Sequence, residues 1–375
     1  MRRTVTLFLC ALALLVTAGL ILVYSASSTY YRNSPNHFVI RQGIALALSL
    51  CVGIVVARID YHFWSRPWVL TLITILTLAG LCAVFLFPVV KGSRRWIDLR
   101  IYSVQPSEFA KISILIVLST WFDRVGPRSS SFLRGFLIPG LIVAVMTAPI
   151  LLAPDLGATA VIVVVAATVF LAAGTRLSYM FASVPVAIGG LVLILLKDAH
   201  RRGRMMDFLA GLFGKDGAQA YQTIQSLNAF VIGGPLGVGL NNSIQKYRYL
   251  PEAHTDFIYA IAGEELGLAA SLIIILLFGI LLICGTRIAS RAPDRLGRFL
   301  GLGLTVLLCF EAGFNMGMVM GCLPTKGLAL PFVSYGGSSL MASMIAVGML
   351  LNIARQSFVA EAEAPSSMRN ALQHI

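Results

Sequence analysis

The chain has 375 residues, of which 58% are hydrophobic and only 12% are charged. Soluble domains carry about 25% charged residues on a hydrated surface, so this composition excludes a soluble globular protein. The charges lie in short intervals between apolar runs, and a run of about 20 residues is long enough to cross a bilayer as a helix. The net charge of +13 indicates an anionic environment or ligand. We expect that partner to be lipid or phosphate and not nucleic acid.

Ten apolar runs predict an all-α, polytopic integral membrane protein of about ten transmembrane helices. The runs lie near residues 5–25, 43–58, 67–88, 106–122, 134–153, 157–174, 179–196, 256–284, 298–321 and 337–354. An even number of spans puts both ends of the chain on the same side of the membrane. We predict a single transmembrane domain over residues 1–354, with a long extracytoplasmic loop at about 197–255. A polar, disordered cytoplasmic tail is expected over 355–375.

The first run follows Arg2 and Arg3 and ends near Ser25. A secretory signal peptide has an apolar region of about 7–15 residues, so this longer run favours an uncleaved first span. With the N-terminus inside, the short cytoplasmic loops hold about twice as many Lys and Arg residues as the short outer loops, which fits the positive-inside rule. The outer face is nevertheless basic, and it suits either a phosphate-bearing ligand or lipid headgroups.

A basic loop precedes the fourth predicted span. It contains Lys91, Arg94 and Arg95, followed directly by Trp96. Arginine binds phosphate oxygens in a bidentate manner, whereas a tryptophan ring suits the depth of lipid headgroups. The loop is therefore either a pyrophosphate-binding segment or an interfacial anchor without a ligand.

The span that follows begins with charged residues inside apolar sequence. Pro106 suits the first turn of a helix because its missing N–H has no partner there. Glu108 and Lys111 lie three residues apart on one helix face, so we expect them to face inward and pair. Ionisable groups inside a membrane span are costly, and Glu108 lies within about a turn of the outer surface. These two residues are therefore candidates for function as well as for a structural ion pair.

Two segments rich in glycine and proline predict turns. In the turn from Ala153 to Gly157, Asp155 is expected to cap the next helix. The segment from Gly233 to Gly239 looks like a phosphate loop only superficially, because no strand precedes it and no Gly-Lys-Ser/Thr follows. Its glycines predict backbone that bends back towards the membrane.

Asp256 is the sharpest candidate for a catalytic group. It follows Glu252 and His254 and opens a long apolar segment. A carboxylate at that position can act as a general base or as a ligand of Mg²⁺ or Mn²⁺. The structural alternative is that Thr255 or Asp256 caps the helix. Glu264 and its neighbour Glu265 lie about 12 Å deeper along the helix, so we expect them to be internal pairing partners.

The last outer segment, from Gly321 to Ser339, contains two prolines and several glycines and cannot form a straight span. Its Lys326 places a cation near the other basic groups, and its Ser334 is a candidate polar contact. In the preceding span, Glu311 and Asn315 lie four residues apart, and we expect them to satisfy each other or a neighbour.

Seven ordered motifs resemble a known family, the SEDS proteins (shape, elongation, division and sporulation), which include FtsW and RodA. The resemblance covers nearly all of the chain after the first span. It rests on Lys91-Gly92 with Arg95-Trp96-Ile97, Gln105-Pro106-Ser107-Glu108 with Lys111, Pro154-Asp155-Leu156-Gly157, Tyr221-Gln222 with Gln225-Ser226, Pro251 to Phe257, Gly263 to Gly267, and Pro324 to Gly327 with Ser334 to Ser339. The segments Asn242 to Lys246 and Leu250 to His254 look more like the division branch than the elongation branch.

The resemblance implies a peptidoglycan glycosyltransferase that polymerises lipid II for septal wall synthesis in the bacterial inner membrane, with its site on the extracytoplasmic face. It implies that Asp256 and Glu108 are catalytic and that a divalent cation is a possible cofactor. It also implies a class B penicillin-binding protein and other divisome membrane proteins as partners. The residues expected to bind the substrate or its pyrophosphate are Lys91, Arg94, Arg95, Trp96, Lys111, Arg204, His254, Lys326 and Ser334.

Three alternatives remain open from the sequence. An elongation-type glycosyltransferase would use the same chemistry. A flippase for lipid II would use the intramembrane charges as a translocation path, but its site should lie near the midplane and its halves often show inverted repeats. A non-catalytic scaffold leaves Asp256 and the basic outer face unexplained.

Overall fold

The computed structural model describes residues 1–28, 36–89, 93–98, 102–197, 202–203, 206 and 221–363. Lys91 and Arg204 lie outside these ranges. Within them, all ten predicted spans are helices. They are α1 (Arg2–Ser27), α2 (His37–Arg58), α4 (Pro67–Ala83), α5 (Pro106–Val125), α6 (Ile138–Leu152), α7 (Leu156–Ala173), α8 (Leu177–Lys197), α11 (Ile258–Ser290), α12 (Arg295–Val319) and α13 (Gly337–Glu363).

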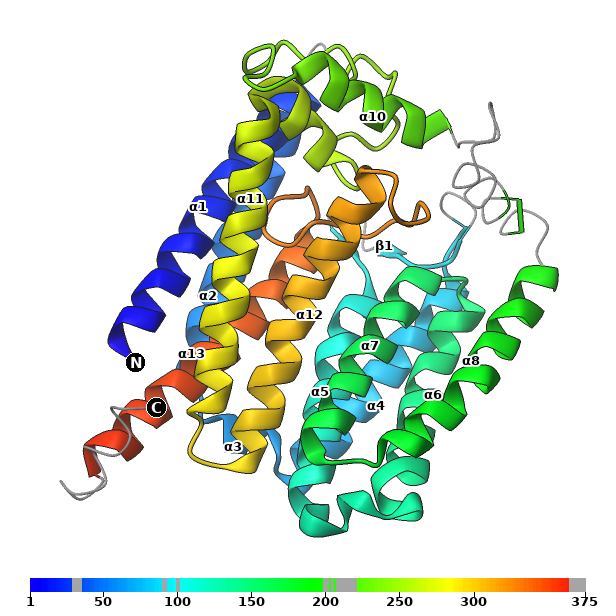
Figure 1. The fold of residues 1–375 in the computed structure, drawn as a ribbon, viewed down its shortest axis with the longest axis vertical. Helices are drawn as coiled ribbons and strands as arrows, with labels where there is room; N and C mark the ends of the chain where they lie inside the picture. The colour runs from blue at the N-terminus through cyan, green and yellow to red at the C-terminus, as the bar shows by residue number, and fades with distance from the viewer. Residues whose placement is uncertain are drawn as a thin grey trace.

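The all-α, polytopic membrane fold is confirmed. Eight of the described helices are long and apolar enough to cross a membrane. Of the other two, α5 carries four charged residues, and α8 is an apolar helix of 21 residues whose one charged residue is Lys197. The helices stand roughly side by side in one bundle, and α8 lies at its edge (Figure 1).

Short elements close the two ends of the bundle. The helix α10 (Tyr221–Gly233) and the antiparallel pair of strands β1 (Ile97–Asp98) and β2 (Ser103–Val104) lie at one end, called here the α10 end (Figure 1). The helix α3 (Tyr61–Trp64) lies at the opposite, α3 end, together with the 3-10 turn η2 (Gly126–Ser130) and the π turn η3 (Leu133–Leu137). A further 3-10 turn, η1 (Val84–Leu86), follows α4.

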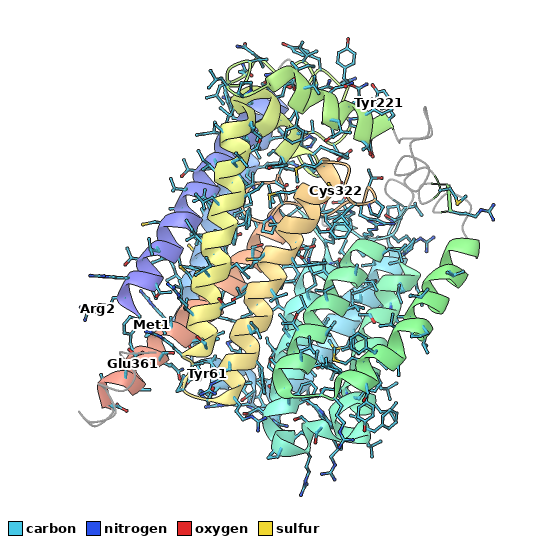
Figure 2. All side chains as sticks on the ribbon, in the orientation of Figure 1. Met1, Arg2, Tyr61, Tyr221, Cys322 and Glu361 are labelled. Atoms are coloured by element: carbon cyan, nitrogen blue, oxygen red, sulfur yellow. The ribbon has the colours of Figure 1, made fainter. Side chains whose placement is uncertain are left out.

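The side chains show which parts of the chain share an end. Tyr61 and Glu361 lie towards the α3 end, whereas Tyr221 and Cys322 lie towards the α10 end (Figure 2). Met1 also lies on the α3 side of the view. The first helix therefore starts, and the last helix stops, on the same side of the bundle, as an even number of spans requires.

Helices α12 and α13 form the centre of the bundle. About two thirds or more of the most apolar window of each is buried inside the protein, 67% for α12 and 72% for α13, whereas only 17% of the α4 window is. Helix α12 packs against α5, α7, α11 and α13, and α13 packs closely on α2. Any group carried by α12 is therefore held by neighbours on several sides.

Helix α11 is broken at Gly267, which the sequence did not indicate. Gly267 has a φ of 77°, a value that glycine adopts without the steric cost of a Cβ. The glycine-rich loop after α10 packs into this break, and an ideal Cβ on Gly267 would lie 2.5 Å from the backbone N of Gly237. The loop also donates from Val238 N to Glu264 O at 3.0 Å. The predicted bend of residues 233–239 towards the bundle is therefore present, and it supplies hydrogen bonds that the broken helix lacks.

The last helix extends past the residue at which the disordered tail was predicted to begin. Helix α13 continues past Arg355 to Glu363, so the expectation of disorder from residue 355 was wrong for nine residues. Residues 359–363 are Val-Ala-Glu-Ala-Glu, mostly strong helix formers, and Ser357 is 1% exposed because it packs inside the bundle.

A cluster of polar side chains fastens the α3 end. The two ring nitrogens of His62 lie 2.7 Å from an Asp60 oxygen and 2.5 Å from an Asp294 oxygen. Asp294 also caps α12 by accepting from Gly297 N at 2.7 Å, and Asp60 accepts from Gln356 of α13 at 2.6 Å. Burial lowers the pKa of the His62 imidazole, but the hydrogen bonds and charges of the two carboxylates outweigh it, so the pKa lies above the ordinary histidine value.

The raised pKa of His62 predicts a stability that depends on pH. The contribution is fully present below the pKa of an unfolded histidine and is lost as pH rises through the higher folded pKa. The melting temperature in detergent should therefore fall as pH rises above about 6.5 in the wild type and change less in His62→Gln. The ring is 46% exposed, so we expect an effect below about 1 kcal/mol. Parallel curves for the two proteins would contradict this role of His62.

Candidate functional site

Four segments from distant parts of the sequence meet at the α10 end of the bundle. They are the β1–β2 segment, the turn before α7, the residues that lead into α11, and the residues between α12 and α13. Contacts between them include Tyr335 N to His254 O at 3.0 Å and Arg95 Nη2 to Pro154 O at 2.6 Å. These irregular segments bring most of the described candidate residues to one place.

Asp256 and Arg95 lie on the same side of Gly327. An ideal Cβ on Gly327 would lie 3.1 Å from Asp256 Oδ2 and 3.9 Å from Arg95 Nη1, so both charged groups are within 4 Å of one point. Asp256 is half-buried, and Gly327 is exposed. The lack of a side chain at Gly327 therefore leaves space beside a carboxylate and a guanidinium that open towards the end of the bundle.

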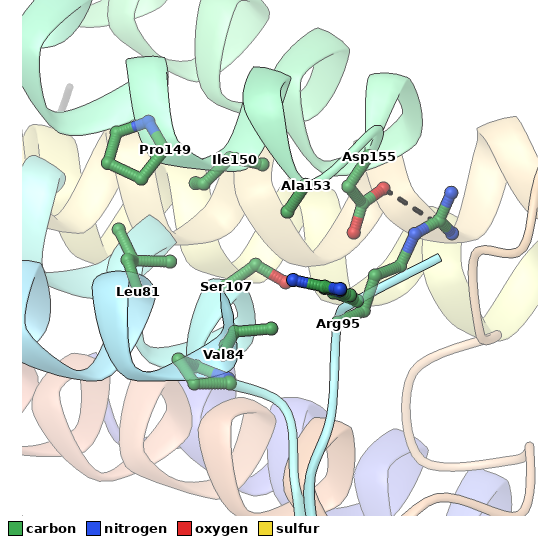
Figure 3. Close-up of a pocket in the computed structure, with 10 residues that line it drawn as sticks. Leu81, Val84, Arg95, Ser107, Pro149, Ile150, Ala153 and Asp155 are labelled. Atoms are coloured by element: carbon green, nitrogen blue, oxygen red, sulfur yellow. Dashed lines mark ion pairs between the residues drawn. The ribbon is translucent and has the colours of Figure 1, made fainter. Parts of the chain in front are cut away.

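Arg95 also faces a second carboxylate. Its Nη1 lies 3.8 Å from Asp155 Oδ1, as the dashed line in Figure 3 shows. Asp155 caps α7 as predicted, accepting from Ala158 N at 3.2 Å, and it also accepts from Gln105 Nε2 at 3.4 Å. The role of Asp155 as a partner of Arg95 was missed, because the two residues lie 60 positions apart and only the fold brings them together.

A small pocket lies beside Arg95 and Asp155 (Figure 3). Its floor is apolar, and its polar lining consists of Arg94, Arg95, Ser107 and Asp155. Arg94 is exposed and donates to Phe85 O at 3.0 Å, and Trp96 is half-buried. The two arginines therefore mark the boundary between apolar helices and the polar end of the bundle, which is the environment expected for them from the sequence.

Ser334 holds the segment before α11 in place. Its hydroxyl donates to Thr255 O at 2.6 Å and accepts from Leu330 N at 2.8 Å. Gln42 of α2 donates to Ser334 O at 3.2 Å and accepts from Gly336 N at 3.3 Å. Ser334 was predicted to contact a substrate. In this structure its hydroxyl binds backbone groups, and it thereby holds the segment that carries Asp256.

His254 belongs to an aromatic cluster. Its ring centroid lies 4.8 Å from that of Phe38 and 5.7 Å from that of Tyr335, and its backbone carbonyl accepts from Tyr335 N at 3.0 Å. The side chain is buried, with an exposed fraction of 8%. Lys326 is half-buried and directly precedes Gly327, the residue whose ideal Cβ would lie close to Asp256.

The alternative role of Asp256 as a helix cap was wrong. Helix α11 begins at Ile258, and Phe257 occupies the capping position without a side-chain hydrogen bond. Thr255 donates instead to Glu252 Oε2 at 3.1 Å. Asp256 therefore lies one residue before the capping position of the helix that follows it.

Glu108 and Lys111 form the predicted ion pair, and a third residue joins them. Lys111 Nζ lies 2.8 Å from Glu108 Oε1 and also contacts Glu311 of α12. The side chains of Lys111 and Glu311 are 2% and 5% exposed. Glu311 and Asn315 were expected to satisfy each other or a neighbour, and each is satisfied by a neighbour: Glu311 by Lys111 of α5, and Asn315 by two backbone carbonyls.

The second buried acidic pair is also satisfied internally, as predicted. Glu264 accepts from Ile244 N at 2.8 Å and contacts the Ser243 hydroxyl, and Glu265 accepts from Ser25 Oγ at 2.5 Å. Lys246 Nζ lies 3.5 Å from Glu265. These contacts tie the loop after α10 to α11 and α1, so they stabilise the α10 end and do not reach Asp256.

The fold and this arrangement of residues define a polytopic membrane protein whose reactive polar groups gather where its helices end. The family model described as "Cell cycle protein", the FtsW/RodA/SpoVE family, matches residues 5–358. The chain belongs to this family.

Named relatives match over nearly their whole lengths. The "Probable peptidoglycan glycosyltransferase FtsW" of Trichlorobacter lovleyi is 41% identical over 346 residues, which cover 90% of this chain and 90% of the relative. The "Stage V sporulation protein E" of Bacillus subtilis is 38% identical over 352 residues, covering 92% of this chain and 95% of that protein.

Solved structures share the fold at lower sequence identity. A chain from "Structural coordination of polymerization and crosslinking by a peptidoglycan synthase complex" superposes with a TM-score of 0.72 and 24% identity, over 94% of this chain and 97% of that chain. The rod shape determining protein RodA of Thermus thermophilus gives a TM-score of 0.65 at 24% identity, over 94% of this chain and 96% of that chain.

The buried triad of Lys111, Glu108 and Glu311 predicts a large effect on stability. Lys111→Met leaves two buried carboxylates without their cation, so we expect a loss of about 3–5 kcal/mol in the free energy of unfolding. Adding Glu311→Gln to that variant should restore part of the loss, because it removes one of the two unpaired charges. Thermal unfolding in mild detergent measures both. A wild-type melting temperature for Lys111→Met would contradict the pairing.

Proposed function

We propose that this chain is a peptidoglycan glycosyltransferase that polymerises lipid II into glycan strands for septal wall synthesis. Membership of the FtsW/RodA/SpoVE family and the names of the relatives support the activity. The observation that carries it at the level of residues is the placement of Asp256 and Arg95 around Gly327. A carboxylate beside a cation is the pair of charges that a glycosyl transfer with an anionic leaving group requires.

The reaction assigns a role to each charge. The GlcNAc 4-hydroxyl oxygen of the acceptor attacks the anomeric carbon of the MurNAc donor, while the bond from that carbon to the pyrophosphate oxygen breaks. The electron pair of the broken bond leaves with undecaprenyl pyrophosphate, and the hydroxyl proton passes to Asp256 acting as the general base. Arg95, together with Arg94 and Lys326, offsets the charge that develops on the leaving pyrophosphate. Lys91 and Arg204 remain proposed contributors from outside the described residues.

Glu108 has a proposed role through Lys111. The two residues share an ion pair at 2.8 Å one turn inside α5, and Glu108 is 8% exposed. At that depth Glu108 acts on the site by holding the first turn of α5, whose Ser107 lines the pocket beside Arg95. We therefore assign Glu108 a positioning role, in place of the direct catalytic role expected from the resemblance.

A divalent cation fits the site only as a partner of the substrate. No group of three or more His, Cys, Asp or Glu side chains that could hold a metal converges anywhere in the described ranges. Mg²⁺ commonly takes one or two carboxylates together with substrate phosphates and water, so Asp256 could supply the protein ligand for Mg²⁺ or Mn²⁺. Such an ion would add positive charge beside the leaving pyrophosphate.

The proposed setting is the bacterial inner membrane, with the α10 end on the extracytoplasmic face and both termini in the cytoplasm. The excess of Lys and Arg in the short loops of the α3 end supports this orientation. We propose a class B penicillin-binding protein as the partner, within a larger set of divisome membrane proteins. The structural match to a component of a peptidoglycan synthase complex supports such a partner.

The described contacts favour an enzyme over a flippase. A translocation path needs intramembrane charges that face the substrate. Here Lys111 pairs with Glu108 and Glu311, and Glu264 and Glu265 are held by the loop after α10. The charges that remain for a substrate lie at the end of the bundle.

The first experiment compares wild-type protein with Asp256→Asn in detergent, using labelled lipid II, Mg²⁺ and a class B penicillin-binding protein. Removal of the general base should lower glycan polymerisation by about 10²–10⁴-fold. Asp60→Asn, a carboxylate change at the α3 end, should retain activity. If neither wild type nor variant makes polymer, but lipid II crosses sealed liposomes that contain the protein, the flippase replaces this proposal.

Gly327→Ala tests the space beside Asp256. The backbone of Gly327 is not in the left-handed region, so alanine is accepted there, but its methyl group would lie 3.1 Å from Asp256 Oδ2. A shift of a few tenths of an ångström in the carboxylate should lower kcat by up to about tenfold. Gly279→Ala is the matched control, because no atom lies within 4 Å of its added methyl group. Equal kcat values for the two variants would show that Gly327 does not border the reacting groups.

A further inference from the structure

Asn315 joins the two segments that carry the proposed catalytic groups. It lies on α12 and is 0% exposed. Its Nδ2 donates to Asp256 O at 2.8 Å and to Leu328 O at 2.6 Å, so one side-chain amide binds the backbone of the general base and of the residue after Gly327. Both partners are carbonyl oxygens, and this fixes which way the amide faces.

The backbone that Asn315 holds is not held by regular structure. Asp256 lies in a run of turns that ends before α11 begins at Ile258, and residues 324–330 form neither helix nor strand. Ser334 Oγ donates to the preceding carbonyl, that of Thr255, at 2.6 Å. Two consecutive carbonyls are therefore fixed by side chains. Both side chains also bind the segment that contains Gly327, Asn315 at Leu328 O and Ser334 at Leu330 N, and Asn315 binds it nearer to Gly327.

The helix that carries Asn315 is itself rigidly placed. Glu311 lies one turn before Asn315 on α12 and contacts Lys111 of α5 inside the bundle. At its other end, α12 is capped by Asp294, which also binds His62. Asn315 therefore ties the backbone at the α10 end to a buried helix whose own position is fixed.

We propose that Asn315 is a positioning residue of the transfer reaction, which sets the distance of the Asp256 carboxylate from the segment at Gly327 and from Arg95. The proposal rests on the function proposed above. Its physical basis is that a displacement of about 1 Å in a reacting group can cost about 10²-fold in rate, whereas binding of a large lipid substrate depends on many other contacts. Asn315 does not touch the substrate, so its effect should fall on kcat and not on KM.

The test compares Asn315→Asp with Asn352→Asp. Asn352 is the matched control, since it is also 0% exposed and its Nδ2 donates to a backbone carbonyl, Ala57 O, at 2.8 Å, but it lies at the α3 end. Both variants should lose melting temperature. Assayed below both melting temperatures, only Asn315→Asp should lose kcat, by about 10–100-fold, with the KM for lipid II within about twofold of wild type.

The pH dependence of kcat gives a second readout. A carboxylate that moves away from Arg95 loses part of the attraction that favours its ionised form. The acid limb of the pH–rate profile should therefore shift to higher pH in Asn315→Ala, which adds no charge beside Asp256, and remain in place in Asn352→Ala. A general loss of stability would not move this limb.

The outcomes separate this proposal from the proposed function. The role of Asn315 would be overturned, and the proposed function would stand, if wild type makes polymer but the two variants have equal kcat values. An effect of Asn315→Asp confined to KM would have the same meaning. An absence of polymer from wild type would overturn the function itself.

If Asn315→Asp does not fold, Asn315→Ser is compared with Asn315→Ala, which has nearly the same volume but no donor. A higher kcat for the serine variant supports positioning, and equal values contradict it.

Discussion

One ammonium group, that of Lys111, lies between two carboxylates from helices far apart in the sequence. Its contacts with Glu108 of α5 and Glu311 of α12 are almost completely removed from solvent. In a low-dielectric interior an unpaired charge is far more costly than a paired one, so this arrangement fixes α5 and α12 relative to each other. The two helices carry Ser107, which lines the pocket beside Arg95, and Asn315, which binds the backbone of Asp256.

At the α10 end, the groups that need partners inside the protein are backbone N–H and C=O groups. These groups are partly buried but lie outside helices and strands, and a buried polar group without a partner is costly. Side chains from the bundle supply the missing partners: Asn315, Ser334 and Gln42 bind carbonyls or amides of the loops, and Glu264 binds the amides after α10. Irregular backbone is thereby held by side chains instead of by the hydrogen bonds of a helix or sheet.

This construction suits the proposed reaction. The lipid part of the substrate requires an apolar environment, whereas the sugars and the pyrophosphate require water and charge, so the transfer has to take place where the helices end. A rigid bundle with side-chain clamps keeps Asp256 and Arg95 close to Gly327 while leaving that end of the protein open. The His62 cluster at the opposite end holds α3, α12 and α13 together and has no contact with these groups.

Much of the fold follows from the sequence. The ten apolar runs, Pro106 in the first turn of α5, and Asp155 as the cap of α7 are local features, set by the length of a bilayer, the missing N–H of proline and the reach of an aspartate side chain. The pairing of Glu108 with Lys111 could also be predicted, because the period of one helix places them together. The resemblance to the family's motifs indicated Asp256 as the candidate catalytic residue.

Tertiary structure decided everything that joins separate segments. Glu311 could not be assigned to Lys111, nor Asp155 to Arg95, because charge attraction acts through space and the sequence gives no distances between helices. The break at Gly267 became visible only with the loop that packs into it, and Ser334 and Asn315 could be recognised as supports only when their backbone partners were known. Local propensity and hydropathy thus determine which segments are helices in the membrane. The placement of the reactive groups depends on burial and pairing between those helices, which only the packed fold creates.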